Sequence, residues 1–596
     1  MNPRKPYDGT RRNLLIAMDV GTTYSGASYC LLDPSVVPEI QTVTRFPARE
    51  HVGGDAKIPS IIYYGQDGSV KAVGAEATQE GILEKAEDED WVPSKWFKLH
   101  LRPNDKDEDT VDQAIPPLPP NKSAVTVFSD FLRYLFQCTK DFIIQSTPYG
   151  VSVWESVEDN IQFMLSHPNG WEGAQQSQMR RAAILAGLIT DLKEDHGKVQ
   201  FVTEGEASLH YCLNNGCVTP GLGVVIVDAG GGTIDLSSYE PEDSKSDAQK
   251  KMSFREMTRP QCYFTGSIFN VKDKARQYLQ NKLKLAESRF LEDIDYICDC
   301  FDKTTKLTFK SPDEPAFIKF GRARDRDLDV GIKSGQMKLS GTDVAKFFEP
   351  SIQSIMNAII LQQKSCANKV DVVFLVGGFA ANDYLFKTLT EFLKSTGLNL
   401  CRPQNYSNKA VADGAVSLYL DHFVTSRIAR WHYGIKVYEE FNAFDPGHAQ
   451  REQTSEIRLA TNKRMVPGRF STILSKNTSV AATTEFRQGP YTHFREESEI
   501  WKRSPMTPFK IYCYRGMQQT PKWFDEDADN YIALCDVEVD VQAPAQLHRN
   551  VLTGKIYYEF EYSVILSFGL TELKAQVAWI EGGVEKRGPA TSIYDN

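Results

Sequence analysis

The sequence predicts an α/β protein made of two similar halves, followed by a smaller β-rich domain. Stretches typical of strands and of helices alternate from residue 14 to about residue 430, which is the pattern of α/β folds. Within this region one short pattern occurs twice, as "LLIAMDVGTTYSGASYCLL" and as "GVVIVDAGGGTIDLSSY". After about residue 430, alternating runs such as "YYEFEYSVILSFG" replace the long helical patterns.

Length and composition narrow the class of protein. The 596 residues allow about three to five domains. A formal net charge of −10 and the absence of a long Lys/Arg block argue against a nucleic-acid-binding protein. No apolar run approaches the ~18 residues of a membrane span, and the apolar stretch Leu14–Met18 is too short for a secretion signal.

The cysteine pattern indicates reduced thiols. The eleven cysteines have no metal-like CxxC spacing, and their odd number fits an unsecreted chain. Cys298 and Cys300 form a CxC, but they would point to different sides of a predicted helix. We therefore expect an intracellular protein in the cytoplasm, with the nucleus as a second compartment.

The elements of the first half can be predicted in order. Residues 1–13 predict a flexible arm, and strands are predicted at Leu14–Asp19, Ala27–Leu32 and Ile61–Tyr64. The polar, Pro-rich stretch 102–123 predicts an exposed loop. A helix follows over 124–143, with an apolar stripe at helical spacing formed by Val127, Phe131, Leu132, Leu135 and Phe136.

The same alternation continues along the chain. "NIQFMLSHPNG" predicts a buried strand and a turn, "AQQSQMRRAAILAGLI" a helix, and "VQFVTEGEASLHYCL" a strand, turn and helix. Residues 241–258 predict a polar insertion, and helices are expected to predominate from Ser267 to about Ser365. "VDVVFLVGGFAANDYLFKTLTEFL" predicts strand, Gly-Gly turn and helix, and "NKAVADGAVSLYLDHF" predicts another helix. A domain boundary is predicted at 425–435.

The repeated pattern predicts two β-hairpins with polar tips. In the first copy Asp19 ends a strand, Gly21 permits a tight turn, and Thr22 and Thr23 bring hydroxyl groups to the tip. In the second copy Asp228 ends a strand and Asp235 begins the returning strand. The turn between them consists of Gly230, Gly231, Gly232 and Thr233.

Such tips predict a phosphate site that contains a metal ion. Unpaired backbone N–H groups at a turn bind anions without a cationic side chain. Neighbouring aspartates repel phosphate unless Mg²⁺ lies between them, and Mg²⁺ accepts one or two carboxylates together with phosphate oxygens. One Gly-rich hairpin alone would be better explained as a plain turn. Two copies with the same Asp-x-Gly spacing favour two turns that hold one phosphate chain from both sides.

A third Gly-rich turn follows the two hairpins. Gly377 and Gly378 come after an apolar strand and open a helix, so backbone there could approach a flat ligand. Strand–Gly-Gly–helix is common in α/β proteins, so this turn alone does not indicate a ligand site. It does so only because it follows the two hairpins in the chain.

Together the three motifs resemble those of a known superfamily. "DVGTTYS", "DAGGGTID" and "LVGGF" are similar to the first phosphate, second phosphate and adenosine motifs of the actin-like ATPases. Within these they resemble heat-shock protein 70 ATPase domains, above all the divergent member-twelve group and its fungal relatives. The resemblance covers roughly residues 14–430. It implies a two-lobed actin-like ATPase fold with duplicated ribonuclease-H-like lobes and a cleft for ATP and Mg²⁺.

The resemblance also implies domain boundaries. Lobe I is expected at 14–205 and lobe II at 206–365. An adenosine-site strand with return helices is expected at 366–430, and a β-rich C-terminal domain at 431–596.

The same resemblance implies roles for the hairpin residues. Asp19 and Asp228 would hold Mg²⁺ through water, and Asp235 with Glu204 would orient the attacking water. The residues that would contact the nucleotide phosphates are Gly21, Thr22, Thr23, Tyr24, Gly230, Gly231, Gly232 and Thr233.

Other implied roles are less specific. A lysine that reaches the terminal phosphate is expected in "VPSKWFKLHL", where Lys98 is preferred to Lys95 and a surface lysine is the alternative. Asp302 and Lys306 would flank the ribose or adenine, or else form a solvated helix face. The residues expected near the nucleoside are Gly266, Gly377, Gly378 and Phe379.

The chain also departs from the family pattern. Phe379 and Ala381 stand where ordinary heat-shock 70 proteins carry Ser and Arg, so contacts to adenine differ. No acidic, leucine-rich linker occurs near residue 430, and the chain ends about where a helical lid would begin.

These departures leave three hypotheses. The first is a slow Mg-dependent ATPase switch, chaperone-like, that reaches a protein client through its C-terminal domain. The second is a non-catalytic nucleotide-binding scaffold. The third is a sugar kinase of the same superfamily, for which we find no convincing sugar site. None of the three requires nucleic acid or a membrane span.

Overall fold

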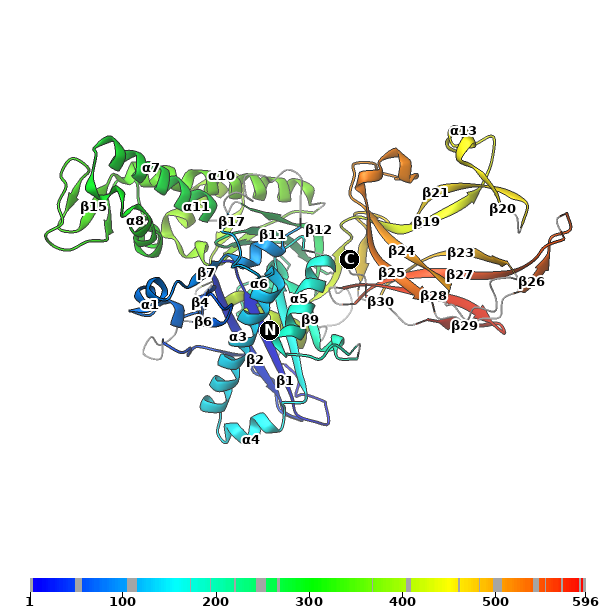
Figure 1. Cartoon of the computed structure of the whole chain (residues 1–596), viewed down its shortest axis with the longest axis horizontal. Coiled ribbons are helices and arrows are strands. Elements are labelled where there is room, and N and C mark those ends of the chain that lie inside the picture. The colour runs from blue at the N-terminus through cyan, green and yellow to red at the C-terminus, as the bar shows by residue number, and fades with distance from the viewer. Residues whose placement is uncertain are drawn as a thin grey trace. The chain divides into compact units, whose positions relative to one another are not determined.

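A computed structural model gives the fold of the chain (Figure 1). The residues that it describes are 4–48, 56–103, 115–171, 173–192, 194–218, 221–242, 253–264, 268–366, 368–403, 409–458, 461–481, 483–496, 506–539, 546–552, 554–569, 572–588 and 591–592. The chain divides into two compact units, Met1–Trp171 with Gln178–Val424, and Glu172–Ser177 with Thr425–Asn596. The first unit has the predicted two-lobed α/β fold, and the second is rich in strands.

Lobe I of the first unit is built on a sheet in the order β3-β2-β1-β8-β9, with β4 paired to β2. β1 and β2 form an antiparallel hairpin, whereas β1, β8 and β9 are parallel. The strands are β1 Asn13–Val20, β2 Tyr24–Leu32, β3 Gln41–Thr42, β4 Ile58–Pro59, β8 Ile161–His167 and β9 Val199–Thr203. A smaller sheet, β6-β5-β7, contains β5 Ile61–Tyr64, β6 Val70–Val73 and β7 Val92–Lys95.

The helices of lobe I bury apolar faces against this sheet. In α3 the side chains of Val127, Phe131, Leu132 and Leu135 are fully buried, as the predicted stripe requires, whereas Phe136, the fifth predicted member, is half-buried. Ser123 caps this helix, since its side chain accepts a hydrogen bond from the backbone N–H of Thr126. The helices are α1 Ile82–Asp88, α3 Ala124–Ser146, α4 Gly150–Glu155, α5 Gly173–Ala186 and α6 Glu204–Asn214, with shorter turns at Glu76–Thr78, Phe97–Leu101 and His196–Lys198.

Lobe II repeats the topology of lobe I. Its sheet has the order β17-β16-β10-β11-β12, in which β10 and β11 form an antiparallel hairpin and β10, β16 and β17 are parallel. Position by position this matches the order β9-β8-β1-β2-β3 of lobe I, so the predicted duplication is present in the backbone. The strands are β10 Val224–Ala229, β11 Ile234–Pro241, β12 Phe254–Tyr263, β16 Val372–Val376 and β17 Asn399–Cys401.

The helices of lobe II enclose a large apolar core, and a small sheet interrupts them. This sheet, β13-β15-β14, lies where helices were expected to predominate. Its strands alternate buried and exposed side chains, and Gly335 with φ +70° allows the turn between β14 and β15. The elements are α7 Asp273–Leu285, α8 Ile294–Cys300, α9 Lys306–Thr308, β13 Ala316–Lys319, β14 Ile332–Lys333, β15 Gln336–Leu339, α10 Gly341–Ser365, α11 Asp383–Lys394 and α12 Ala410–Asp421, with shorter helical segments at Ile268–Lys272, Arg289–Leu291, Phe301–Thr305 and Phe379–Ala381.

Residues 4–13, for which the sequence predicts a flexible arm, contact the body of the first unit. Arg4 forms an ion pair of 2.8 Å with Asp421 at the end of α12. The backbone of Tyr7 exchanges hydrogen bonds with Val36 and Ser35, at 2.8 and 2.9 Å. These contacts attach the segment to both α12 and the loop after β2.

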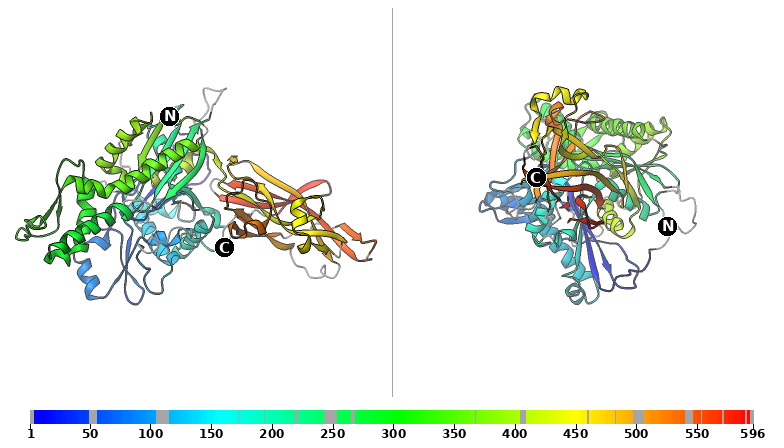
Figure 2. Two further views of the ribbon diagram at one scale, coloured as in Figure 1. Left: turned by 90° about the horizontal axis from the view of Figure 1, so that it is seen from above. Right: turned by 90° about the vertical axis from the view of Figure 1, so that its right-hand side faces the viewer.

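The second unit contains two antiparallel sheets, β20-β21-β19-β24-β25 and β23-β27-β28-β29 (Figure 2). One apolar core combines side chains of both, including Ile435 and Ile511 from the first and Val564 and Leu566 from the second. The elements are β18 Val424–Ile428, β19 His432–Glu440, α13 Pro446–Gln450, β20 Glu456–Arg458, β21 Lys463–Leu474, β22 Ser479–Ala481, β23 Glu485–Glu496, β24 Met506–Tyr514, β25 Tyr531–Val539, β26 Gln546–Arg549, β27 Ile556–Gly569, β28 Glu572–Glu581, β29 Val584–Arg587 and β30 Thr591–Ser592, with short turns at Glu452–Thr454, Phe524–Glu526 and Ala528–Asn530.

Two further findings concern the described part of the chain. All eleven cysteines are free thiols, including Cys298 and Cys300 at the end of α8. None of the described helices combines the length and the apolar character needed to cross a membrane.

Helices α6 and α12 cross with their backbones in direct contact. A Cβ atom added at Gly414 of α12 would lie 1.8 Å from the backbone oxygen of Ala207 in α6. Val411 and Ala415 pack around this point together with Ala207. Because α6 follows the last strand of the lobe I sheet and α12 follows the last strand of the lobe II sheet, this crossing joins the two lobes.

We expect Gly414→Ala to lower the free energy of unfolding by about 2 kcal/mol or more, because a backbone atom cannot give way without separating the helices. Gly197→Ala is the matched control, since a Cβ atom there meets nothing within 4 Å. The control should change stability by less than about 1 kcal/mol. Urea denaturation of both variants measures the difference, and equal effects would contradict the close crossing.

Candidate functional site

The turns of the two predicted hairpins meet. A Cβ atom at Gly231 would lie 2.5 Å from Oγ1 of Thr23, and one at Gly232 would lie 2.7 Å from Oγ1 of Thr22. The β1–β2 turn belongs to lobe I and the β10–β11 turn to lobe II. The structure therefore brings together two segments that are about two hundred residues apart in the sequence.

Local sterics explain the glycines of these turns. At Gly21 a Cβ atom would be 2.3 Å from the carbonyl oxygen of Tyr24, so no larger residue fits this turn. In the second hairpin the backbone N–H of Gly230 donates to the oxygen of Thr233 at 2.9 Å, which closes the turn. Both turns follow a buried strand that ends close to an aspartate, Asp19 or Asp228.

Asp19 has partners within lobe I, whereas the hydrogen-bond partner of Asp228 comes from α6, which follows the lobe I sheet. Oδ1 of Asp19 accepts a hydrogen bond of 2.8 Å from Ser166 at the end of β8, and its Oδ2 lies 2.8 Å from Nζ of Lys57. Oδ2 of Asp228 accepts a longer hydrogen bond, 3.3 Å, from Ser208 in α6. Both carboxylates are at least 95% buried, with exposed fractions of 2% and 5%.

The pKa values of Asp19 and Asp228 shift in opposite directions, because lysines dominate around Asp19 whereas burial and neighbouring acids dominate around Asp228. Burial raises the pKa of Asp19, but the ammonium groups of Lys57 and Lys98 outweigh it and the pKa is lowered. Burial and the charge of Glu204 raise the pKa of Asp228 to about 7. The arrangement has an excess of negative charge, and an added cation would relieve it.

Asp235 has one satisfied and one free oxygen. Its Oδ1 accepts a hydrogen bond of 2.6 Å from the backbone N–H of Asn169 in the turn after β8. Its Oδ2 is buried and has no hydrogen-bond partner among the residues described. Burial, Glu204 and Asp228 raise its pKa well above the usual range. A side-chain hydrogen bond from Thr233 acts in the opposite direction and lowers this pKa. Because a buried acceptor without a partner is costly, Oδ2 could accept a hydrogen bond from a bound water or ligand.

The two lysines proposed from the sequence differ in environment. Nζ of Lys98 lies 2.6 Å from Oε1 of Glu204 at the start of α6, and its side chain is 2% exposed. The same ammonium lies 5.7 Å from the centre of the Trp171 ring. Lys95, at the end of β7, is exposed. The structure thus places Lys98, and not Lys95, beside the predicted cleft glutamate.

The third Gly-rich turn adjoins Asp228. Gly377 has φ +93°, and a Cβ atom there would lie 2.3 Å from Oδ1 of Asp228. At Gly378 a Cβ atom meets nothing within 4 Å, so this residue faces open space. The Phe379 ring is 4% exposed and stacks on Phe348 in the lobe II core. The turn therefore exposes backbone at Gly378 to the open space beside it, while the Phe379 ring is turned into the core.

Asp302 and Lys306 are also brought to this turn. Their side chains form an ion pair with each other. The side chain of Asn382, which caps α11, donates hydrogen bonds to the backbone oxygens of Lys306 and Phe309 at 2.7 and 3.3 Å. The helix that carries the pair is thereby fixed beside the Gly-Gly turn.

The acid set suits a water-rich Mg²⁺ site rather than a closed protein cage. Among the described residues, no group of three or more His, Cys, Asp or Glu side chains is arranged to hold a metal ion. Two carboxylates with bridging water and phosphate form the usual environment of Mg²⁺ in such sites. Asp19 and Asp228 could supply those carboxylates, and Oδ2 of Asp235 could accept a hydrogen bond from a bound water.

Some predicted residues lie elsewhere or outside the described part. Gly266 is outside the described residues. Tyr24 is 47% exposed at the edge of the first hairpin.

Conversely, the sequence analysis did not identify three residues of the site, Lys57, Ser166 and Asn169. Ser166 ends a predicted strand and Asn169 lies in the turn after it, in "LSHPNG". Polar groups at the carboxyl ends of parallel strands are a usual signal of a ligand site.

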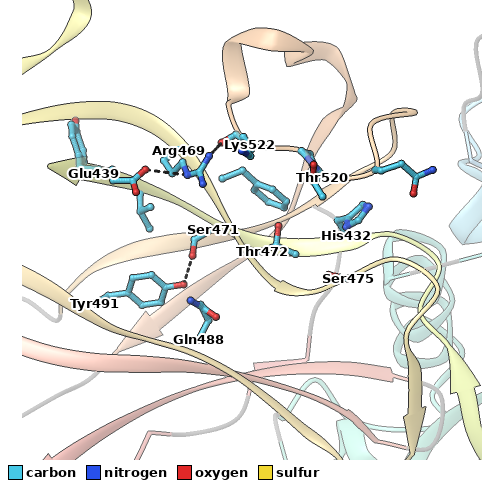
Figure 3. A pocket seen from close by; sticks show the side chains of 15 residues that line it. His432, Glu439, Arg469, Ser471, Thr472, Ser475, Gln488, Tyr491, Thr520 and Lys522 are labelled. Atoms are coloured by element: carbon cyan, nitrogen blue, oxygen red, sulfur yellow. Dashed lines mark hydrogen bonds and ion pairs between the residues drawn. The ribbon is translucent and has the colours of Figure 1, made fainter. Parts of the chain in front are cut away.

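The second unit contains a polar cavity of about 550 Å³ (Figure 3). It lies between β19, β21, β23 and the segment that precedes Trp523. On its walls Arg469 forms an ion pair of 3.1 Å with Glu439, and the hydroxyls of Ser471 and Tyr491 are 2.8 Å apart. The remaining lining residues are His432, Val437, Tyr438, Phe470, Thr472, Ser475, Gln488, Gln519, Thr520, Pro521 and Lys522.

Comparison with known proteins gives one distant relative. The chain is 20% identical over 566 residues to the human protein heat shock 70 kDa protein 12B, an alignment that covers 80% of this chain and 78% of the relative. No family model matches the chain. The similarity supports an Hsp70-like, actin-like ATPase relationship, in agreement with the two-lobed fold.

The contact between the hairpin tips can be tested by a double-mutant cycle. Gly231→Ala should destabilise the protein, because its Cβ would overlap the Thr23 side chain, and Thr23→Ala should relieve most of that overlap. We expect a coupling free energy of about 1 kcal/mol or more from the cycle. Urea denaturation of the four proteins measures it. Strictly additive effects would mean that the two tips do not touch.

The Gly-Gly turn offers a second matched pair. Gly377→Ala should lower the free energy of unfolding by about 2 kcal/mol or more, because of the positive φ and the overlap with Asp228. Gly378→Ala should leave stability within about 0.5 kcal/mol of wild type, since nothing lies near its Cβ. Thermal and urea denaturation test both, and a destabilised Gly378→Ala protein would contradict the open space.

Proposed function

We propose that the protein binds Mg-ATP across the two hairpin turns and hydrolyses it slowly, as a nucleotide-driven conformational switch. The observation that supports this most strongly is the meeting of Gly231 and Gly232 with Thr23 and Thr22, beside Asp19 and Asp228. Two anion-binding turns with adjacent buried carboxylates suit a phosphate chain whose charge is shared with a divalent cation.

Different residues of the chain would bind the phosphates, the metal ion and the nucleoside of Mg-ATP. Backbone N–H groups of Gly230, Gly231 and Gly232 and the hydroxyls of Thr22 and Thr23 would contact the phosphates. Asp19 and Asp228 would hold the water shell of Mg²⁺, which when bound neutralises phosphate charge. The open space at Gly378 would admit the nucleoside, with Asp302 and Lys306 beside it.

Hydrolysis would depend on Asp235, Glu204 and Lys98. The free Oδ2 of Asp235 is an acceptor for the attacking water, and Glu204 would help to orient it. Lys98 would stabilise the charge of the terminal phosphoryl group. Its ammonium is bound to Glu204 at 2.6 Å, so both groups must rearrange before they can act on a phosphate and a water. This requirement predicts slow turnover.

The proposal extends to the second unit as an effector. A protein client would bind the β-rich unit, and its polar cavity is the described feature that suits a polar chain segment. Chaperone-like action in the cytoplasm belongs to this part of the proposal. The chaperone-like action is proposed from the distant similarity to heat shock 70 kDa protein 12B alone, whereas the cavity supports only the binding of a polar chain segment.

A nucleotide-binding scaffold without turnover is the second candidate. Two observations favour it. Phe379 is buried in the lobe II core, so the Gly-Gly turn offers no side-chain contact to a base from that position. The Lys98–Glu204 ion pair also withdraws two of the three groups needed for hydrolysis.

Binding and turnover measurements separate the two candidates. Calorimetry with ATP, ADP and GTP, with and without Mg²⁺, should show Mg-dependent binding of adenine nucleotides. Asp228→Asn and Lys98→Met should each lower Mg-dependent ATP turnover about 100-fold, whereas Lys95→Met, at an exposed position, should not. Turnover of Asp228→Asn equal to wild type would remove Asp228 from its role. Tight binding by wild type without turnover would establish the scaffold.

A further inference from the structure

Lys57 stands in the candidate site although no sequence motif marks it. Its Nζ lies 2.8 Å from Oδ2 of Asp19, and the two side chains are 17% and 3% exposed. Lys57 directly precedes β4, which pairs with β2 next to the first hairpin turn. A Cβ atom at Gly26 would lie 2.6 Å from the oxygen of Ala56 and 3.3 Å from Cγ of Lys57. The backbone around the lysine is therefore packed tightly onto the hairpin.

The charge of Lys57 acts on more than one acid. Burial disfavours the ammonium, but Asp19, Asp228 and Glu204 together raise the pKa of Lys57. Glu204 already has a direct partner in Lys98 at 2.6 Å, whereas Asp228 has only hydrogen-bonding neighbours among the contacts described. Lys57 is therefore the cation that balances the Asp19 side of the site.

We propose that Lys57 is a built-in counter-cation that competes with a divalent metal ion for Asp19 and keeps free metal out of the site until a nucleotide arrives. This inference rests on the proposed function. An ammonium beside a carboxylate repels a second cation strongly in a buried, weakly screened place. A phosphate chain brings new negative charge, to which the flexible lysine side chain can turn, and Asp19 is then released for the metal.

The chemistry of the two cations makes the exchange reasonable. Lysine has a compact charge on a flexible stem with three donors, so it can move between a carboxylate and a phosphate without losing hydrogen bonds. Mg²⁺ loses its water reluctantly and gains little from one already neutralised carboxylate. The expected outcome is that metal and nucleotide bind in a strongly coupled way, and that Lys57 is the source of much of that coupling.

The test is metal binding by the full chain without nucleotide, with Mn²⁺ as the probe and the signal of free Mn²⁺ measured by electron paramagnetic resonance. Wild type should bind Mn²⁺ weakly, and Lys57→Met should bind it at least about tenfold more tightly. Lys57→Arg should resemble wild type because it keeps the charge. Lys71→Met is the matched control at an exposed lysine and should also resemble wild type.

A second readout uses ADP. In the presence of a chelator, Lys57→Met should bind ADP about tenfold more weakly than wild type, and Mg²⁺ should restore most of the loss. Circular dichroism establishes that the variant is folded. Mn²⁺ affinity of a folded Lys57→Met protein equal to that of wild type would overturn the proposal, while Mg-ADP binding by wild type would leave the proposed function intact.

Wild type alone also tests the idea, should Lys57→Met not fold. Millimolar Mn²⁺ should leave the melting temperature of wild type unchanged, and Mn²⁺ with ADP should raise it. A clear stabilisation by Mn²⁺ alone would overturn the role of Lys57. If neither ADP nor Mg-ADP binds to wild type, the proposed function fails independently of the Mn²⁺ result.

Discussion

The direct approach of two backbone turns is the constraint on which the rest of the first unit depends. Thr23 and Thr22 leave room for nothing larger than hydrogen at Gly231 and Gly232. Each turn follows a strand that ends near an aspartate, so joining the turns also gathers the buried Asp19, Asp228 and Asp235 close to the half-buried Glu204. Such a concentration of acids is unfavourable by itself, and two lysines partly offset it. The site is thus built with a deficit of positive charge.

The fold could be predicted from the sequence because its main signals are local. The class of fold is confirmed, and the duplication appears as the same strand order in both lobes. Buried strands such as β1 and the stripe of α3 depend on spacing alone, so they can be recognised without knowing what packs against them. The sheet β13-β15-β14 was missed because its strands have two to four residues, too few to show a clear period of two within a helical region.

The site could be predicted only where residues follow one another in the chain. Asp19 with Gly21, and Asp228 with Gly230, are neighbours in sequence, so the order of residues alone reveals their grouping. Lys57, just before β4, and Ser166, in β8, reach the same carboxylate from distant parts of the chain. No motif marks Lys57, and the polar end of the strand around Ser166 is a general signal that does not name its partner, so the meeting of both with Asp19 depends on tertiary packing. The catalytic and binding roles assigned to the motif residues remain predictions.

The crossing of α6 and α12 has a consequence for motion inside the first unit. At Gly414 and Ala207 the two helix axes come as near as backbones can, with no side chain interposed. A contact of this kind resists separation of the helices, while the absence of interlocking side chains at that point would permit one helix to rotate against the other. Since α6 begins at Glu204 and α12 follows the strand after the Gly-Gly turn, a rotation of one helix against the other at this crossing would change the distance between Glu204 and that turn.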